Sequence, residues 1–180
     1  MAYLPIPATD TPCGFMPFDA PMSISPYVTD SSVAAIYRGD LVIAEADGAL
    51  AVATTNSTAI VGAAAQYGVV STANNNFLVY DNVLQKFWAQ DDADTAAMAA
   101  TSVGANCLIV ATTGSTSLLT SAHEIDSNSA ATTAANPIKI VALHPCEGFS
   151  YATSAAAGQQ RKWVCVINNH FNAPYQQVGI

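Results

Sequence analysis

Short β-forming runs separated by turn signals follow one another from about residue 33 onward. Two of them, Leu41–Glu45 and Ala49–Ala53, flank Asp47-Gly48, a dipeptide that favours the tight turn of a β-hairpin. The remaining runs predict strands at Thr58–Ala64, Phe77–Asp81, Lys86–Gln90, Asn106–Ala111, Ile138–Leu143 and Lys162–Asn168. This spacing predicts a mainly β fold, a single barrel- or sandwich-like domain, rather than alternating β and α units.

One short helix is expected within this β-rich chain. Asp94 is a good N-cap for a helix over Thr95–Ala100, and Gly104 stands where helix C-termini favour glycine. The Ala- and Thr-rich stretch Ser127–Asn136 has low complexity and predicts a loop.

Proline is concentrated at the start of the chain, where six of the nine prolines precede residue 27. Proline fixes φ and lacks an amide hydrogen, so neither a helix nor a central strand is expected there. Apolar side chains lie between the prolines, which predicts a segment that packs against something. We therefore divide the chain into an extended N-terminal arm, residues 1–30, and a β-rich domain, residues 31–180. The arm either meanders over its own domain or lies on a neighbouring subunit.

The chain is poor in charge: 10% of its residues are charged, against roughly 25% in an ordinary soluble domain. Such a surface suits a protein that packs against other subunits, because desolvating unpaired charge is costly. The net charge of −8 and a single adjacent basic pair, Arg161-Lys162, argue against nucleic-acid binding.

No export or membrane signal is recognised in the sequence. The first basic residue is Arg38, so a signal peptide's basic n-region is missing, and no run of about 18 apolar residues could span a membrane. The four cysteines (Cys13, Cys107, Cys146 and Cys165) form no CxxC pair and are expected to be reduced, although a Cys146–Cys165 bridge is conceivable.

Two groups of side chains contain residue types that can bind metal ions. Asp91, Asp92 and Asp94 lack the glycine and glutamate that close a calcium loop, so we expect a solvated turn and a helix N-cap. His123 would face opposite to Glu124 and Asp126 on a strand, which leaves surface hydrogen bonding as the expected role of these residues. His144 and His170 could join them only through the fold.

Nothing in the sequence predicts catalysis or a bound cofactor. There is no GxSxG elbow and no phosphate-binding loop that ends in Gly-Lys. On the expected last strand, Trp163, Cys165 and Ile167 alternate with Val164 and Val166, so both faces are apolar and the strand is expected to be central. Trp88 is likewise expected in the core, with a sugar-stacking platform as the alternative.

The order of several motifs resembles the head decoration (capsid cement) proteins of tailed bacteriophages. Four pieces carry the resemblance: 36–42 (IYRGDLV) with the Asp47-Gly48 turn and 60–62 (IVG); 79–81 (VYD) with 87–91 (FWAQD) and 104–106 (GAN); 115–117 (STS) with 126–127 (DS) and 137–141 (PIKIV); and 163–170 (WVCVINNH).

The resemblance covers roughly residues 36–171. It implies a β-barrel-like domain, a homotrimer, bound to the major capsid protein on the outer surface of the virion, with no catalysis. From the residues themselves we expect no cofactor, no metal, no nucleic-acid partner and no membrane partner. In that role the arm aromatics Tyr3, Phe15, Phe18 and Tyr27 are expected to contact the capsid or another subunit. The alternatives are another virion role, as a small coat protein or tail module, a carbohydrate-binding β-domain, and a cupin-type metal enzyme.

Overall fold

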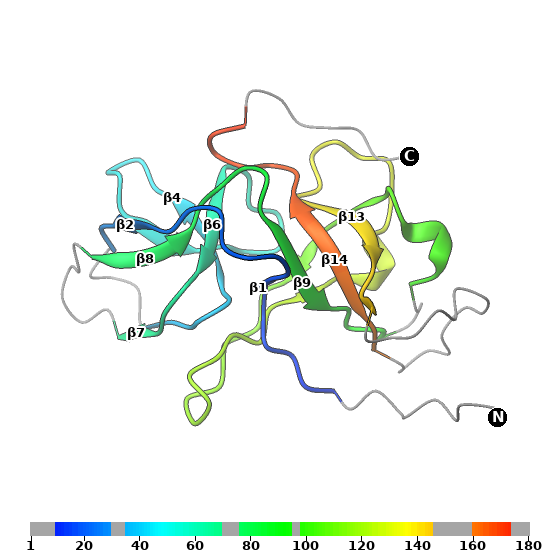
Figure 1. Ribbon diagram of the computed structural model, residues 1–180, viewed down its shortest axis with the longest axis horizontal. Helices are drawn as coiled ribbons and strands as arrows, with labels where there is room; N and C mark the ends of the chain where they lie inside the picture. Colours follow the sequence, from blue (N-terminus) through cyan, green and yellow to red (C-terminus); the bar gives the residue numbers. More distant parts are fainter. Residues whose placement is uncertain (1–9, 30–34, 70–75, 95–97, 146–159, 174–180) are drawn as a thin grey trace.

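The structure, a computed structural model, describes residues 10–29, 35–69, 76–94, 98–145 and 160–173, and within them two five-stranded antiparallel sheets dominate (Figure 1). The β14 sheet has the strand order β1 (Met16–Pro17), β9 (Lys86–Gln90), β14 (Lys162–Ile167), β13 (Ile138–Leu143) and β10 (Asn106–Cys107). The β6 sheet has the order β2 (Ser25–Tyr27), β8 (Phe77–Tyr80), β6 (Ile60–Ala64), β4 (Leu41–Ala44) and β5 (Leu50–Val52). Two short pairs accompany them: β3 (Ala35–Ile36) with β7 (Gly68–Val69), and β11 (Ile109–Val110) with β12 (Glu124–Ile125).

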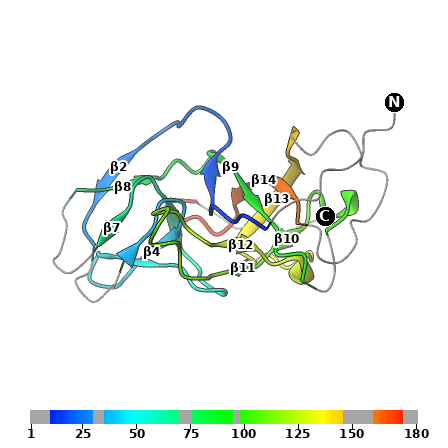
Figure 2. The same ribbon diagram turned by 90° about the horizontal axis from the view of Figure 1, so that it is seen from below.

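The prediction of a mainly β, sandwich-like single domain is confirmed. The larger apolar cluster joins the two sheets, with Leu41 and Ile60 of the β6 sheet in the same cluster as Phe87, Trp163 and Cys165 of the β14 sheet. Burial of such side chains contributes about 1.5–3 kcal/mol each to stability. Figure 2 shows the same two sheets from a perpendicular direction, at opposite ends of the long axis.

A second apolar cluster covers the other face of the β6 sheet. It joins Ile36 of β3 to Val42, Val61, Phe77 and Val79 of the β6 sheet. Strand β6 is therefore buried along its whole length, which accounts for its uninterrupted run of apolar and small residues.

The predicted hairpin is confirmed. Strands β4 and β5 pair antiparallel, and Asp47 Oδ1 accepts a hydrogen bond from the backbone N–H of Ala49 at 2.9 Å. The other expected strands are present within one or two residues of their predicted ends, apart from Asn106–Ala111. That run divides into β10 and β11, in different sheets, because the Leu108 N–H between them donates to Ser129 Oγ at 2.8 Å.

The helix prediction is wrong over its described part. Residues 95–97 lie outside the described ranges, and Ala99 is extended, with φ −116° and ψ 172°. Met98 is 1% exposed and belongs to the main core, so tertiary packing holds the chain extended there. The helical turns are the 3₁₀ segments η1 (Ala100–Ser102) and η2 (Ser127–Ser129), the second within the predicted loop. No helix in the described ranges is long and apolar enough to cross a membrane.

The described part of the arm, residues 10–29, lies on its own domain. It supplies the edge strand β1 of one sheet and the edge strand β2 of the other, so Pro17 and Pro26 occupy the edge positions that proline tolerates. Phe15, directly before β1, is fully buried, and its N–H donates to Gly39 O at 2.9 Å. The sequence left open whether the arm lies on its own domain or on a neighbouring subunit, and residues 10–29 lie on their own domain.

Replacing Gly14 with alanine is expected to destabilise the fold strongly. A Cβ there would lie 2.4 Å from Ser121 Cβ and 2.5 Å from Gly39 O, and φ is +72°. We expect G14A to cost about 3 kcal/mol or more in chemical unfolding, because left-handed strain adds to overpacking. G48A is the matched control: φ is +85° but nothing lies within 4 Å, so it should cost about 1–2 kcal/mol. Equal losses in the two variants would contradict the close approach at Gly14.

Candidate functional site

The predicted contact aromatics lie in different environments. Tyr3 is outside the described residues. Phe15 is 0% exposed within its own domain, so its side chain has no surface left for a partner, and its prediction as a contact residue is corrected. Phe18 and Tyr27 are half-buried. Tyr27 Oη donates to Asp81 Oδ2 at 2.9 Å, and burial together with Asp81 raises the pKa of Tyr27 to about 12.

An exposed apolar surface runs along strand β2 and the neighbouring β8–β9 segment. Exposure alternates along residues 24–28, and Pro26 pairs in register with Leu78, so the outward side chains of both strands lie together. The six large members of this surface, which we name the apolar edge, are Met22, Ile24, Val28, Leu78, Val83 and Leu84. They are six of the eleven exposed large hydrophobic residues in the described ranges.

Sequence reasoning missed the apolar edge. Residues 24–28 (ISPYV) show no apolar–polar alternation in the sequence, and Pro26 at their centre argued against a strand. The edge is tied to the body by Gln85, whose Oε1 accepts a hydrogen bond from the Met22 N–H at 2.9 Å. Figure 2 shows β2 beside β8 on the outside of the β6 sheet.

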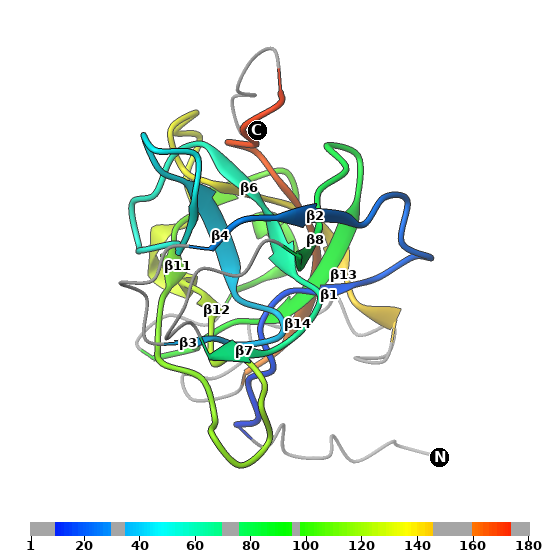
Figure 3. The same ribbon diagram turned by 90° about the vertical axis from the view of Figure 1, so that its left-hand side faces the viewer.

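A second exposed apolar feature is the loop of residues 113–120, which projects from the body (Figures 1 and 3). Leu118 is 74% exposed, and Leu119 is 42% exposed with a left-handed φ of +56°. Backbone hydrogen bonds close the loop, from Ser115 N–H to Thr120 O and from Leu119 N–H to Ser115 O, each at 2.8 Å. The loop therefore presents two leucines at a fixed, strained tip.

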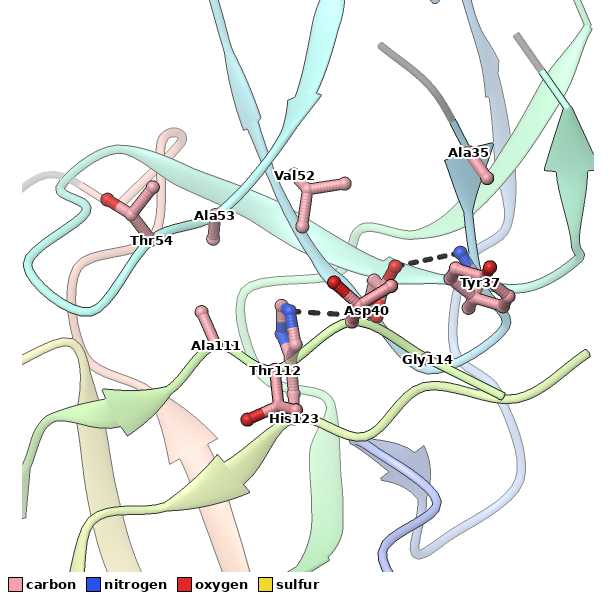
Figure 4. Close-up of a pocket in the computed structure, with 11 residues that line it drawn as sticks. Ala35, Tyr37, Asp40, Val52, Ala53, Thr54, Ala111, Thr112, Gly114 and His123 are labelled. Carbon is pink, nitrogen blue, oxygen red and sulfur yellow. Dashed lines mark hydrogen bonds and ion pairs between the residues drawn. The ribbon is translucent and has the colours of Figure 1, made fainter. Parts of the chain in front are cut away.

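A pocket of about 310 Å³ lies between the β3–β4 connection, the end of β5 and the segment that follows β11 (Figure 4). Asp40 and His123 belong to its lining, and both are buried. Asp40 Oδ2 accepts a hydrogen bond from the Tyr37 N–H at 2.7 Å, and Asp40 Oδ1 lies 3.6 Å from His123 Nε2. His123 Nδ1 accepts from the Leu41 N–H at 3.3 Å.

The electrostatics of this pair favour its uncharged forms. Burial raises the pKa of Asp40 and lowers the pKa of His123, while the attraction between the two groups opposes both shifts. Both ring nitrogens of His123 face groups of the protein, so neither is left to serve a substrate as a base. The arrangement suits a structural link between the start of β4 and the segment before β12. The expected surface role of His123 is thereby corrected.

The acidic residues near the end of β9 form one cluster around β12 and η2. Gln90 Nε2 donates to Asp10 Oδ1 and Glu124 Oε1, both at 3.1 Å, and the Ser127 N–H donates to Asp92 Oδ1 at 2.9 Å. Burial, with the neighbouring acids Asp10, Asp92 and Asp91, raises the pKa of Glu124 to about 7. The members of this acidic cluster are Asp10, Asp91, Asp92, Asp94, Glu124 and Asp126.

Asp91 differs from the expected solvated turn. It is fully buried, and its two oxygens accept hydrogen bonds from Arg161 N–H at 2.7 Å and Trp163 Nε1–H at 2.9 Å. Burial raises the pKa of Asp91 to about 6. This carboxyl group therefore joins the end of β9 to the start of β14.

The histidines do not gather with the acids. His123 faces Asp40, His144 stacks edge-on against Phe18 at 5.4 Å, and His170 is buried, its Nδ1 accepting from the Asn172 N–H. Within the ranges that the structure describes, no three His, Cys, Asp or Glu side chains come together as metal ligands would.

The two tryptophans have different settings. Trp163 is fully buried on the central strand β14, as predicted. Trp88 is only half-buried, so its core prediction is corrected, and Lys162 Nζ lies over its ring at 5.0 Å from the centroid. That lysine covers one face of the ring.

The described cysteines are free thiols. Cys107 and Cys165 are buried in the main core, and burial raises the pKa of Cys107 to about 12. Cys146 lies outside the described residues, and the conceivable Cys146–Cys165 bridge remains an untested prediction.

Comparisons with known proteins identify no relative that could indicate the function of this chain. No family model matches the chain, and neither a curated protein nor a solved structure matches it.

Replacing Glu124 with glutamine is expected to stabilise the protein more at about pH 8 than at about pH 5. The folded pKa of about 7 exceeds the ordinary value of 4.5, so ionisation costs stability as pH rises through this window. Thermal unfolding at the two pH values measures the difference. E45Q, in the exposed β4–β5 turn, gives the baseline for removing one carboxylate. A gain for E124Q that is the same at both pH values would contradict the assignment.

Replacing Asp91 with alanine is expected to destabilise the fold by roughly 2–4 kcal/mol, because two buried N–H donors lose their acceptor. Chemical unfolding measures this loss. The exposed residue Glu45 provides the control, and E45A should stay within about 0.5 kcal/mol of the unaltered protein. A loss below about 1 kcal/mol for D91A would show that Asp91 is not a structural link.

Proposed function

We propose that the chain is a structural virion protein that decorates the head of a tailed bacteriophage. As a cement protein it binds the outer surface of the capsid and stabilises the shell by bridging capsomers. Its partners are the major capsid protein and further copies of itself in a homotrimer. The mechanism is mechanical, through many apolar and backbone contacts, and involves no catalysis.

The apolar edge is the observation that carries this proposal. Six exposed large hydrophobic residues lie on two adjacent segments of a chain that also has two buried apolar clusters. Exposed apolar side chains gathered in one place mark an interaction surface. Pro26 lacks an amide hydrogen at the outer strand, which disfavours the addition of another strand there. Contact through side chains is therefore the favoured mode.

The low charge of the chain supports the same function. Only 10% of the residues are charged, so a broad contact can form without desolvating many ionised groups. A stable contact buries about 800 Å² on each partner. The net charge of −8 suits the outside of a shell better than the genome-facing side, where phosphates would repel it.

The location and copy number of the chain on purified particles test the proposal. We expect immunogold labelling over the outer surface of the head, and mass spectrometry should give a fixed ratio to the major capsid protein. Labelling confined to the tail would favour a tail module instead. Absence of the chain from particles would contradict a virion role altogether.

A double polar substitution in the apolar edge is expected to weaken binding to emptied heads by about 30- to 150-fold, because each of the two lost apolar burials costs about 1–1.5 kcal/mol. We would compare I24S/L84S with the unaltered protein by co-sedimentation at increasing protein concentration. V69S on β7, where the valine is 61% exposed, is the matched control and should bind normally. Unchanged binding of I24S/L84S, or an equal loss for V69S, would exclude the apolar edge as the contact.

A further inference from the structure

The pocket at the end of β5 contains a polar atom that the fold leaves unpaired. Asp40 is 2% exposed and belongs to the pocket lining. Its Oδ2 accepts the hydrogen bond from the Tyr37 N–H, whereas its Oδ1 is buried and accepts no hydrogen bond from the described residues. His123 Nε2 lies 3.6 Å from Oδ1, which is too far for a hydrogen bond (Figure 4). A buried oxygen in this state, on the wall of a cavity, marks the place of a group from outside the chain.

His123 does not supply a positive charge to Asp40. Its Nδ1 accepts a hydrogen bond from the Leu41 N–H, and only the neutral imidazole ring has a nitrogen that can accept. Burial lowers the pKa of His123, which favours the same neutral form, although Asp40 opposes the shift. A carboxylate in a buried position is stabilised when a cation pairs with it. The group expected at Oδ1 is therefore a cationic donor rather than a neutral hydroxyl.

The walls and the size of the pocket select the kind of cation. Val52, Ala53 and Ala111 give it apolar walls, and a volume of about 310 Å³ is at the small end for ligand pockets. Lysine has an apolar stem that suits such walls, and its compact ammonium group can bind a single acceptor. A guanidinium group is recognised best by both oxygens of a carboxylate, but Tyr37 already occupies Oδ2. The pocket therefore suits a lysine side chain better than an arginine side chain.

The pocket and the apolar edge belong to opposite edges of the β6 sheet. Val52 ends β5, the outermost strand on one side, whereas β2 of the apolar edge is the outermost strand on the other. Three exposed threonines, Thr54, Thr112 and Thr113, contribute to the pocket lining and give it a polar mouth. A partner side chain can therefore enter the pocket while the apolar edge holds another contact.

We propose that this pocket binds a lysine side chain of a partner protein, whose ammonium group donates a hydrogen bond to Asp40 Oδ1. The stem of the lysine packs against Val52 and Ala111. In the proposed function the partner is a capsid protein, and the pocket gives the chain a second contact, as bridging between capsomers requires. Only this identity of the partner rests on the proposed function; the chemistry of the pocket does not.

A free analogue of the lysine side chain gives the first test. We would titrate n-butylammonium chloride into the purified full chain at constant ionic strength and follow the backbone N–H signals of Tyr37 and Leu41 by NMR. Both signals should shift and saturate, and n-butanol, which has the same stem without a charge, should bind at least about 10-fold more weakly. Equal binding of n-butanol would overturn the inference. The absence of a saturable shift would do the same, since water alone would then satisfy Oδ1.

Two variants and a matched control test whether binding occurs in this pocket. D40N keeps an acceptor for the Tyr37 N–H but removes the charge, and A111L narrows the pocket from an exposed position. Each should weaken the binding of n-butylammonium at least about 10-fold. A46L, the same change at an exposed alanine in the β4–β5 turn, should bind normally. Unchanged binding by A111L would overturn the inference even if D40N fails to fold, and so would an equal loss in A46L.

Emptied phage heads identify the source of the lysine and separate this inference from the proposed function. In co-sedimentation, D40N and A111L should bind heads at least about 10-fold more weakly than the unaltered chain, and A46L should bind normally. Normal binding of D40N and A111L would overturn the inference of a capsid lysine and leave the decoration role untouched. Binding of n-butylammonium by a chain that does not associate with heads would support the pocket and contradict the decoration role.

Discussion

The close approach of three backbone segments, at Gly14, Gly39 and Ser121, is the constraint on which the rest of the structure depends. Gly14 and Gly39 both have left-handed φ, and a Cβ on Gly39 would lie 2.6 Å from Cys13 O. The Ser121 N–H donates to Arg38 O at 2.9 Å and completes the junction. Only glycine fits at positions 14 and 39, and Phe15, directly after Gly14, is buried in the core between the sheets.

This junction fixes the position of the proline-rich segment in the fold. Because β1 pairs with β9 and β2 pairs with β8, residues 10–29 join the two sheets and are part of the folded domain. The outward side chains of β2 then become a surface held in place by the fold, in contrast to a free strap. In the proposed function, the apolar edge is the surface that contacts the shell.

Local sequence patterns predicted where most of the strands lie, but not which segments lie beside one another in the fold. Strands β9, β13 and β14 and the β4–β5 hairpin follow from apolar periodicity and turn chemistry, which act over a few residues. The burial of Phe15, His123 and Asp91 depends on segments far apart in the chain, which no local pattern encodes. The helix prediction was wrong at Met98 and Ala99 for the same reason, because burial of Met98 in the core outweighs helix propensity. The apolar edge was not predicted because Pro26 was taken to argue against a strand. Proline is excluded from central strands only and is tolerated on an edge strand such as β2.

Hydrogen–deuterium exchange of the free and the capsid-bound protein tests the central claim most directly, that residues 10–29 are part of the domain and expose a binding surface. The account predicts that the amides of Phe15 and its neighbours are protected in the free protein. Residues 22–24 and 82–84, which belong to the apolar edge but lie outside β2 and β8, should gain protection on binding to heads. Rapid exchange around Phe15 in the free protein, with protection acquired on the capsid, would contradict the account and favour an arm that orders on its partner.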